Sequence, residues 1–215
     1  MLKLIILDFD GVIVASMDIK TEAFRKLFSD YPKYVDAIIE HHKRNCGVSR
    51  YEKFSHIYKN ILKQPLNDEK LAELDKRFSA LVVDEIKSCP FVPGVLEFLE
   101  NYAKKMKLFI ISSTPEKELR YLVGERGLQK YFRGVYGAPS KKSEIALQII
   151  KEERVGKKEA LFVGDTAEDY IEAKKAGVLF IGRVVDLASC PFPGDVKIVR
   201  DLNELSTLVE GLLSR

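Results

Sequence analysis

Short apolar segments recur along the chain, and each ends at a polar residue or a glycine. Five of them have the length and continuous apolar character of strands that are buried on both faces of a parallel sheet. They cover residues 2–7, 107–111, 134–137, 159–163 and 177–181. Helical patterns lie between the later segments, at residues 95–103, 116–126, 143–153 and 167–176. This alternation predicts right-handed βαβ units and an α/β fold with a doubly wound, Rossmann-like parallel sheet.

The chain between the first two predicted strands has a different pattern, with amphipathic helices and no buried strand. Two helical faces are formed by Tyr51, Phe54, Tyr58 and Ile61, and by Leu71, Leu74, Phe78 and Leu81. Pro32 and Pro65 mark breaks between helices. A crossover between parallel strands needs only about a dozen residues. We therefore predict an inserted all-helical cap domain at residues 15–90 and an α/β core formed by residues 1–14 and 91–215.

Composition and charge exclude several classes of protein. With 46% hydrophobic and 31% charged residues, the chain is typical of a folded globular protein. The formal charge of +3 shows no concentrated basic stripe, so nucleic acid is not an expected partner. No segment approaches the roughly 18 apolar residues of a membrane span, so no membrane partner is expected. Three well separated cysteines, Cys46, Cys89 and Cys190, indicate reduced thiols in a cytoplasmic protein.

Polar side chains that could take part in catalysis or binding follow the predicted strands. They are Asp8, Asp10 and Gly11 after the first strand, Ser112, Ser113 and Thr114 after the second, Gly164, Asp165 and Asp169 after the fourth, and Lys142 at a helix start. In open α/β sheets the ligand crevice lies beyond the carboxyl ends of the strands. We therefore expect these residues to meet at one edge of the sheet.

Three carboxylates in one crevice, those of Asp8, Asp10 and Asp165, repel each other unless a cation neutralises them. An oxygen-only set without His or Cys suits Mg²⁺. Ser112 and Lys142 add a hydroxyl donor and a positive charge, both suited to phosphoryl oxygens. One carboxylate could attack phosphorus to form an acyl phosphate, and another could protonate the leaving oxygen and then activate water. The set predicts phosphoryl transfer.

Four segments in order, DFDG, IISS, a lysine at a helix start and GDTAED, resemble the motifs of the haloacid dehalogenase superfamily of phosphohydrolases. The inserted helices resemble those members whose helical cap follows the first motif, such as phosphoglycolate phosphatases and β-phosphoglucomutases. The resemblance covers essentially the whole chain. It implies that Asp8 is the nucleophile, that Asp10 is the general acid/base and that Asp8, Asp10 and Asp165 hold the metal, Asp10 through its backbone carbonyl.

The same resemblance implies a role for the other motif residues. Ser112, with Ser113 beside it, and Lys142 would bind the phosphoryl group, while Asp169 would support the metal shell or Lys142. Lys141 is an alternative for the third-motif lysine, but Lys142 is favoured because it adjoins the helix start.

The cap segment Gly47-Val48-Ser49-Arg50 resembles a loop of β-phosphoglucomutase in which the arginine binds the second phosphate of the substrate. Arg50 is therefore a candidate for substrate contact. Ser49, with Glu52 three residues later, also predicts a capping box at the start of a helix. Gly164 stands where the mutase carries a glutamate ligand, and this departure favours a phosphatase.

Aromatic residues of the cap occur at helical spacing and are expected to form the core of the cap rather than a substrate site; they are Phe24, Phe28, Phe54, Tyr58 and Phe78. Lys20 replaces a histidine of the mutase and could face the crevice, although charged residues on helices are usually solvated. Thr114 could contact substrate or cap the helix that begins near Pro115, and the proline favours the cap. His41 and His42 point in different directions on a helix, so they are not expected to bind a metal together.

We therefore expect a Mg²⁺-dependent phosphatase that acts on a small phosphorylated metabolite through an aspartyl-phosphate on Asp8, with a cap that opens and closes. Two alternatives stay open: a phosphomutase of the β-phosphoglucomutase type, and a non-catalytic binding protein with an idle site of the same appearance. The sequence leaves the substrate open among phosphoglycolate, sugar phosphates and nucleotides. It also leaves the oligomeric state open.

Overall fold

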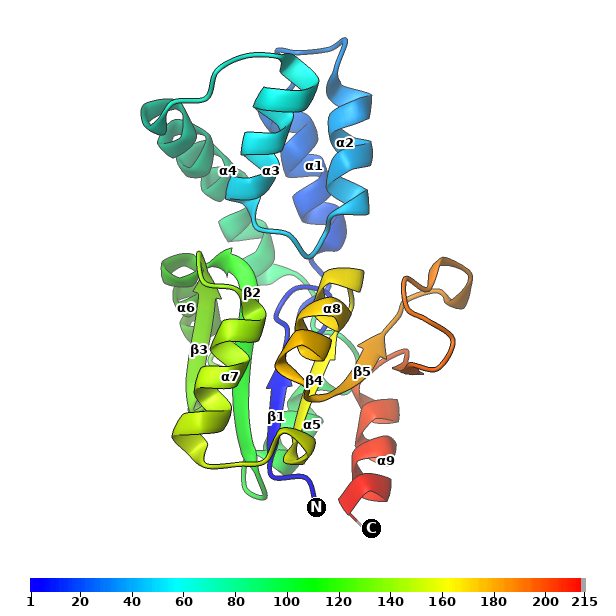
Figure 1. Ribbon diagram of the computed structural model, residues 1–215. Coiled ribbons are helices and arrows are strands. Elements are labelled where there is room, and N and C mark those ends of the chain that lie inside the picture. Colours follow the sequence, from blue (N-terminus) through cyan, green and yellow to red (C-terminus); the bar gives the residue numbers. More distant parts are fainter. Residues whose placement is uncertain (214–215) are drawn as a thin grey trace.

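The computed structural model describes residues 1–213 and shows an α/β core beneath a group of helices (Figure 1). The core contains a six-stranded sheet with the order β3-β2-β1-β4-β5-β6, in which all neighbours are parallel. The strands are β1 (Leu4–Leu7), β2 (Lys107–Pro115), β3 (Gly134–Ala138), β4 (Ala160–Gly164), β5 (Leu179–Arg183) and β6 (Lys197–Val199). Because β1 lies between β2 and β4, three motif-bearing strands are neighbours.

Helices cover both faces of this sheet. They are α5 (Val95–Tyr102), α6 (Glu116–Glu125), α7 (Lys142–Glu153), α8 (Ala167–Ala176) and α9 (Leu202–Leu213). Side chains of β1 alternate between two hydrophobic clusters, as the two-residue period of a strand requires. Ile5 and Leu7 belong to the cluster that contains the buried residues of α5, α6 and α9, whereas Leu4 and Ile6 belong to the cluster of α7 and α8. The doubly wound α/β fold is therefore confirmed.

Two elements of the core were not predicted. Strand β6 has only three residues, and Lys197 at its start is exposed, so it lacks the continuous apolar signal of the other strands. Helix α9 buries Leu202, Leu205 and Val209 against the core. Three short 3₁₀ segments, η2 (Gln129–Tyr131), η3 (Lys157–Glu159) and η4 (Leu187–Ser189), complete the connections. Within the described residues, no helix is both long and apolar enough to cross a membrane.

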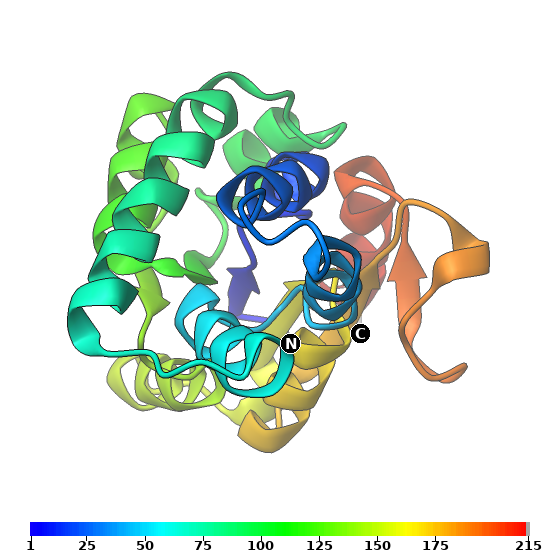
Figure 2. The same cartoon turned by 90° about the horizontal axis from the view of Figure 1, so that it is seen from above.

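The helices between β1 and α5 form the cap, which lies above the carboxyl ends of the strands (Figures 1 and 2). They are α1 (Met17–Leu27), α2 (Val35–Arg44), α3 (Arg50–His56), the π-helical segment η1 (Ile57–Leu62) and α4 (Asp68–Ser88). Pro32 and Pro65 lie between helices, as predicted. The cap domain boundaries at residues 15 and 90 stay a prediction.

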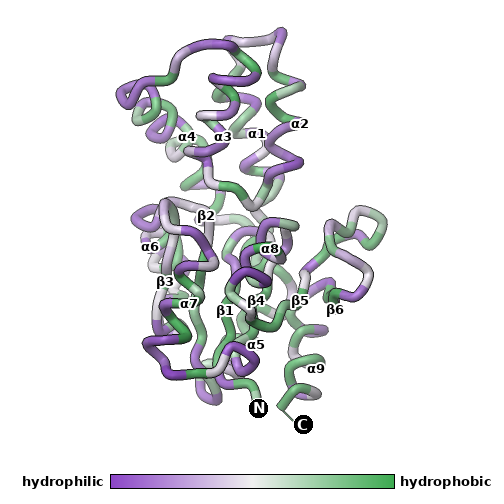
Figure 3. Tube along the Cα trace, in the orientation of Figure 1, coloured by the Kyte–Doolittle hydropathy of each residue, from purple (hydrophilic) through white to green (hydrophobic). Residues whose placement is uncertain are grey.

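Aromatic side chains form the interior of the cap. Phe24, Phe28, Phe54 and Phe78 are almost fully buried, and the rings of Phe24 and Phe78 meet edge to face with centroids 4.9 Å apart. The prediction that these residues are cap core is confirmed. Apolar positions also line the strands of the sheet, while polar positions predominate on the outer faces of the cap helices (Figure 3). The cap and the sheet thus each have apolar interiors.

The cap makes direct contact with the core beside the strand ends. The Ser113 hydroxyl on β2 donates to the Gly47 carbonyl oxygen of the cap at 2.5 Å. A Cβ atom at Gly47 would lie 2.3 Å from Thr166 Oγ1, so this close approach requires glycine. At the second connection between cap and core, Arg126 of the core donates to the Cys89 carbonyl oxygen at 2.8 Å and stacks on the Phe91 ring.

Candidate active site

The predicted site residues converge at the carboxyl ends of β1, β2 and β4. Asp8 directly follows β1, and Asp165 directly follows β4. Ser112 lies in the last part of β2, and Lys142 is the first residue of α7. The expected meeting of these residues at one edge of the sheet is what the structure shows. The cap covers this edge from above.

Lys142 forms the centre of a buried ion-pair network. Its Nζ atom lies 2.6 Å from Asp8 Oδ2 and 2.6 Å from Asp169 Oδ1, and all three side chains are buried. Burial opposes a charge on Lys142, but the carboxylates of Asp169 and Asp8 outweigh it and raise the pKa of the ammonium. Lys141 is exposed. Of the two lysines considered, the structure places Lys142 in the site.

Asp169 is held in place by the start of α8. Its Oδ2 atom accepts hydrogen bonds from the Thr166 backbone nitrogen at 3.1 Å and from the Thr166 hydroxyl at 2.6 Å, and Thr166 in turn accepts from the Asp169 nitrogen. This reciprocal capping box fixes the first turn of the helix. The other oxygen of Asp169 therefore meets Lys142 in a fixed position.

Negative charge accumulates beside Lys142. One carboxylate oxygen from each of Asp8, Asp165 and Asp169 lies within 4.8 Å of the other two. Asp165 Oδ1 is buried and has no hydrogen-bond partner in the described chain. Burial, together with the charges of Asp169 and Asp10, raises the pKa of Asp8 to about 7 despite Lys142, and burial likewise raises the pKa of Asp165.

These observations fit a divalent cation. An oxygen-only set with one unpartnered buried oxygen and excess negative charge is suited to a hard ion such as Mg²⁺. The carboxylates gathered here are those of Asp8, Asp165 and Asp169, whereas the family resemblance implies Asp8, Asp10 and Asp165 as ligands and a supporting role for Asp169. The role of Asp10 was expected through its backbone carbonyl, and this stays a prediction.

Gly11 permits the close approach of two strand ends. Its φ angle of +73° lies in the left-handed region, which favours glycine. A Cβ atom at this position would lie 1.9 Å from Asp165 Oδ2. The glycine of the DFDG segment is thus a steric requirement for placing Asp165 beside Asp8.

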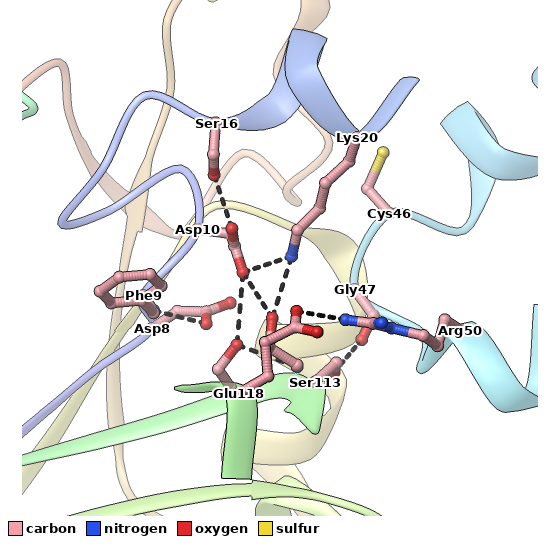
Figure 4. A network of polar contacts seen from close by, with 12 residues as sticks. Asp8, Phe9, Asp10, Ser16, Lys20, Cys46, Gly47, Arg50, Ser113 and Glu118 are labelled. Carbon is pink, nitrogen blue, oxygen red and sulfur yellow. Dashed lines mark hydrogen bonds and ion pairs between the residues drawn. The ribbon is translucent and has the colours of Figure 1, made fainter. Parts of the chain in front are cut away.

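Asp10 lies in a network of its own (Figure 4). Its Oδ1 accepts from the Ser16 hydroxyl at 2.6 Å, and its Oδ2 accepts from the hydroxyls of Thr114 at 2.9 Å and Ser112 at 3.4 Å. The Lys20 ammonium also pairs with Oδ2. Burial alone would raise the pKa of Asp10, but the charge of Lys20 and these hydrogen bonds outweigh it and lower the pKa. Asp10 is therefore held as a carboxylate.

The structure decides between the alternatives for two residues of this network, in both cases against the one that was favoured. Lys20 is not solvated: it lies one turn after Ser16 on α1, on the side that faces the core, and contacts both Asp10 and Thr114. Thr114 does not cap a helix, because β2 continues through it and α6 begins without a side-chain cap. Thr114 is two residues after Ser112, so both hydroxyls lie on the same side of the strand. This two-residue spacing is the sequence feature that could have placed Thr114 beside Ser112.

The serines of the second motif make different contacts. Ser112 Oγ accepts from the Thr114 backbone nitrogen at 3.1 Å and donates to Asp10. The Ser113 hydroxyl donates a hydrogen bond to the Gly47 carbonyl oxygen of the cap. Both residues line a cavity of about 30 Å³ that also borders Asp8, Lys142 and Asp165. Their predicted contact with a phosphoryl group stays a prediction.

Arg50 joins the cap to the core. Its side chain is 5% exposed and pairs with Glu118 of α6 (Figure 4). It also pairs with Asp75 of α4 at 3.2 Å. It also donates to the Ser79 hydroxyl at 2.8 Å and lies over the Phe78 ring. The contacts that the structure shows for Arg50 are thus with the protein, and its contact with substrate stays a prediction.

Ser49 caps α3, as predicted. Its Oγ accepts from the Glu52 backbone nitrogen at 3.3 Å, while the Glu52 carboxylate contacts the Ser49 hydroxyl at 3.2 Å. These Ser49 contacts therefore fix the first turn of α3, on which Arg50 lies.

A larger cavity opens beside the site, between the cap and the β5–β6 side of the core. It has a volume of about 590 Å³ and is bordered by Asp165 and Thr166 of the core and by Lys43 and Gly47 of the cap. This volume lies within the range of small-molecule sites, roughly 300–1,000 Å³. It offers a route by which a small molecule reaches the carboxylates.

Comparison with known proteins agrees with this geometry. The family model for haloacid dehalogenase-like hydrolases matches residues 5–183. A phosphorylated carbohydrates phosphatase of Thermotoga maritima is 29% identical over 194 residues, which cover 86% of each chain. Phosphoglycolate phosphatase 1 of Pseudomonas aeruginosa is 25% identical over 182 residues, which cover 82% of this chain and 67% of the relative.

Solved structures are similar over almost the whole chain. CbbY from Rhodobacter sphaeroides in complex with phosphate has a TM-score of 0.77 at 14% identity, covers 95% of this chain and 96% of its own, and so supports the fold alone. A putative β-phosphoglucomutase from Thermotoga maritima has a TM-score of 0.68 at 25% identity and covers 97% and 99%. Since the family model matches most of its length, this chain belongs to the haloacid dehalogenase-like hydrolases, as its motifs predicted.

Proposed function

We propose that this protein is a Mg²⁺-dependent phosphatase that hydrolyses a small phosphorylated metabolite through an aspartyl-phosphate on Asp8. Its family membership and its relatives that are named phosphatases make it a phosphoric monoester hydrolase. The observation that carries the mechanism is the position of the Asp8 carboxylate. It lies between the Lys142 ammonium, at 2.6 Å, and the carboxylates that gather around Asp165.

The residues around Asp8 divide between the metal and the phosphoryl group. The carboxylates of Asp8 and Asp165 and the backbone carbonyl of Asp10 would hold Mg²⁺, which supplies neutralisation of charge on the phosphoryl oxygens when bound. Ser112, Ser113 and Lys142 donate hydrogen bonds to those oxygens. Asp169 orients Lys142 through its 2.6 Å contact.

The reaction then takes two steps. An Asp8 carboxylate oxygen attacks phosphorus and the bond from phosphorus to the ester oxygen breaks, while Asp10, which must first take up a proton because it rests as a carboxylate, gives that proton to the leaving alkoxide. Asp10 next takes a proton from a water molecule, whose oxygen attacks the acyl phosphate, so that inorganic phosphate leaves and Asp8 is restored. The lowered pKa of Asp10 favours the carboxylate form that the second step needs.

The cap gives this site access control and specificity. We propose that residues 15–90 move as a unit to admit substrate and exclude bulk water. Arg50 is the candidate for substrate contact when its ion pairs with Glu118 and Asp75 are released. The three described cysteines are free, and a cytoplasmic location fits them.

A phosphomutase is the second candidate, favoured by the 25% identity to the putative β-phosphoglucomutase. In that reaction the phosphoryl group returns from Asp8 to a second hydroxyl of the sugar. A mutase needs a bisphosphate activator and gives an isomerised sugar phosphate without free phosphate. A binding protein with an idle site would give neither product.

The test is a phosphate-release screen over many phosphate esters, with Mg²⁺ and with EDTA, for the wild type and Arg50→Ala. The proposal expects release from a subset of small esters, loss with EDTA, and a changed substrate profile for Arg50→Ala. Isomerisation without release of phosphate would establish the mutase. Neither product with any ester would contradict both enzymatic functions.

A further inference from the structure

The underside of the cap contains a buried lysine without an acidic partner. Lys53 of α3 is 4% exposed, and no carboxylate of the described chain lies within ion-pair distance of its ammonium. Its Nζ lies 3.2 Å from the Cys46 carbonyl oxygen and 3.3 Å from His42 Nδ1. Each of the nearby cations Lys20, Arg50 and Lys142 pairs with at least one carboxylate. Lys53 is the exception among them.

The contact with Lys53 fixes the tautomer of His42. A protonated lysine donates hydrogen bonds and accepts none, so beside the Lys53 ammonium His42 Nδ1 accepts and the ring proton lies on Nε2. His42 is 1% exposed, and its Nε2 has no hydrogen-bond partner in the described chain. Burial lowers the pKa of His42 to about 3, in agreement with a neutral ring. The Nε2–H donor thus has no acceptor, and the Lys53 ammonium beside it has two neutral acceptors but no anion.

These donors border the space that leads to Asp8. A cavity of about 30 Å³ is bordered by Lys53, Arg50 and His42. Lys20, His42, Cys46 and Ser113 border both this cavity and the one beside Asp8 and Lys142. The two cavities therefore adjoin, so a ligand whose phosphoryl group lies at Asp8 can extend its other end towards His42 and Lys53.

We propose that Lys53 and the Nε2–H group of His42 bind an oxyanion at the non-reacting end of the substrate. The preferred substrate is then a phosphate monoester with a second anionic group. This inference rests on the proposed function and extends it to substrate class. An oxyanion supplies an acceptor for His42 Nε2–H and a negative charge for Lys53, whereas a neutral group leaves the buried ammonium without a counter-charge. Such a pocket selects by the penalty it places on the wrong ligand.

The first experiment compares esters that differ only at this end. Ethyl phosphate has a neutral end, 2-phosphoglycolate has a carboxylate, and ethane-1,2-diol bisphosphate has a second phosphate. For wild type, kcat/KM with at least one anionic ester should exceed that with ethyl phosphate by about 10- to 100-fold, the range of a charge-assisted hydrogen bond. The arm that shows the preference identifies the anion as carboxylate or phosphate.

Substitutions then connect the preference to the two residues. Lys53→Met should reduce the preference to within a few-fold of unity, and His42→Phe, which keeps the ring packed on Phe24, should reduce it in part. Lys59→Met is the matched control, because Lys59 is an exposed lysine of the next helical segment. It should keep the wild-type preference. The histidine variant provides the test if Lys53→Met does not fold.

Binding separates this inference from the catalytic one. Calorimetry with Asp8→Asn and Mg²⁺ should show tighter binding of the preferred anionic ester than of ethyl phosphate, and Lys53→Met in that background should remove the difference. If this holds while wild type releases no phosphate, the phosphatase function fails and the subsite stands. If wild type hydrolyses all esters equally, or if neither variant changes the preference, the subsite is overturned.

Discussion

The carboxyl ends of the strands, here called the rim of the sheet, have an excess of negative charge, whereas the underside of the cap has a positive charge without an anionic partner. At the rim, Asp8, Asp165 and Asp169 gather with Lys142 as their cation, and burial raises the pKa values of Asp8 and Asp165. Under the cap, the ammonium of Lys53 is buried without an acid, and burial lowers its pKa to about 7. One region lacks a cation and the other lacks an anion. A metal-bound phosphate ester with an anionic end would complete both.

The two regions also differ in how their residues are held. Asp8 and Asp165 follow adjacent strands of the sheet, which fix their separation through the backbone. Lys53 and His42 lie on two helices of the cap, whose position depends on contacts such as Arg50 with Glu118. If the proposed roles hold, the reacting groups lie on the sheet and the groups that select the substrate lie on the cap.

Removal of the proposed nucleophile tests whether the reaction takes place at the rim, and it should give the largest effect. Asp8→Asn should lower phosphate release by at least about 10³-fold, because no covalent intermediate can form. Colorimetric phosphate release measures this loss, and circular dichroism checks that the fold is kept. Near-normal turnover in this variant would place the chemistry elsewhere.

The second carboxylate should give the next largest effect. Asp10→Asn removes the group that protonates the leaving oxygen and activates water, and roughly a 10²- to 10⁴-fold loss in kcat is expected. Ser16→Ala is the milder control, since it removes one hydrogen bond to Asp10 and keeps the carboxylate. Equal losses in the two variants would show that Asp10 acts through structure.

Mg²⁺ tests whether the rim lacks a cation. At 100 times its dissociation constant, a ligand adds about 2.7 kcal/mol of stability, which corresponds to a Tm increase of roughly 5–10 °C for a protein of this size. Differential scanning fluorimetry with and without Mg²⁺ measures the shift. Asp165→Asn should lose most of it, and an unchanged shift would remove Asp165 from the metal site.

The smallest expected effect concerns stability under the cap. Lys53 has a lowered pKa of about 7 in the folded protein and the ordinary value of 10.5 when unfolded. The unfolded chain thus binds more protons between these values, so this group makes stability rise with pH in that window. Lys53→Met removes the buried charge and should have a higher Tm than wild type at pH 6.

The difference in Tm between Lys53→Met and wild type should shrink as the pH rises from about 7 towards 10.5, because folded Lys53 is then largely neutral and the unfolded chain progressively loses the proton that it alone retains. Lys20, Arg50, Asp10, His42 and Cys46 face Lys53 in both proteins, so their titration largely cancels. A gap independent of pH would mean that the ammonium is not desolvated.

The sequence predicts the rim better than the cap for a physical reason. Strand ends of a parallel sheet converge by topology, so the apolar segments before Asp8 and Asp165 were enough to bring these residues together. The choice of Lys142 over Lys141 followed from its place at the helix start. The short strand β6 left too weak a pattern to predict.

The cap contacts depend on how helices pack, which the sequence does not display. A helical lysine is usually solvated, so neither the contact of Lys20 with Asp10 nor the burial of Lys53 was expected. The aromatic cap core was predictable, because spacing alone places those side chains on one face. The partners of a polar group on the same helix are set by tertiary structure.

Transfer of the phosphoryl group through Asp8 underlies the proposed mechanism, and trapping the phosphorylated enzyme is the direct test of this transfer. Wild-type protein mixed with Mg²⁺ and a hydrolysed ester, then quenched in acid within milliseconds, is digested and analysed by mass spectrometry. We expect one added phosphoryl group on Asp8, which hydroxylamine removes and which the Asp8→Asn variant lacks. Phosphate release by the wild type with no phosphoryl group on Asp8 at any quench time would contradict it.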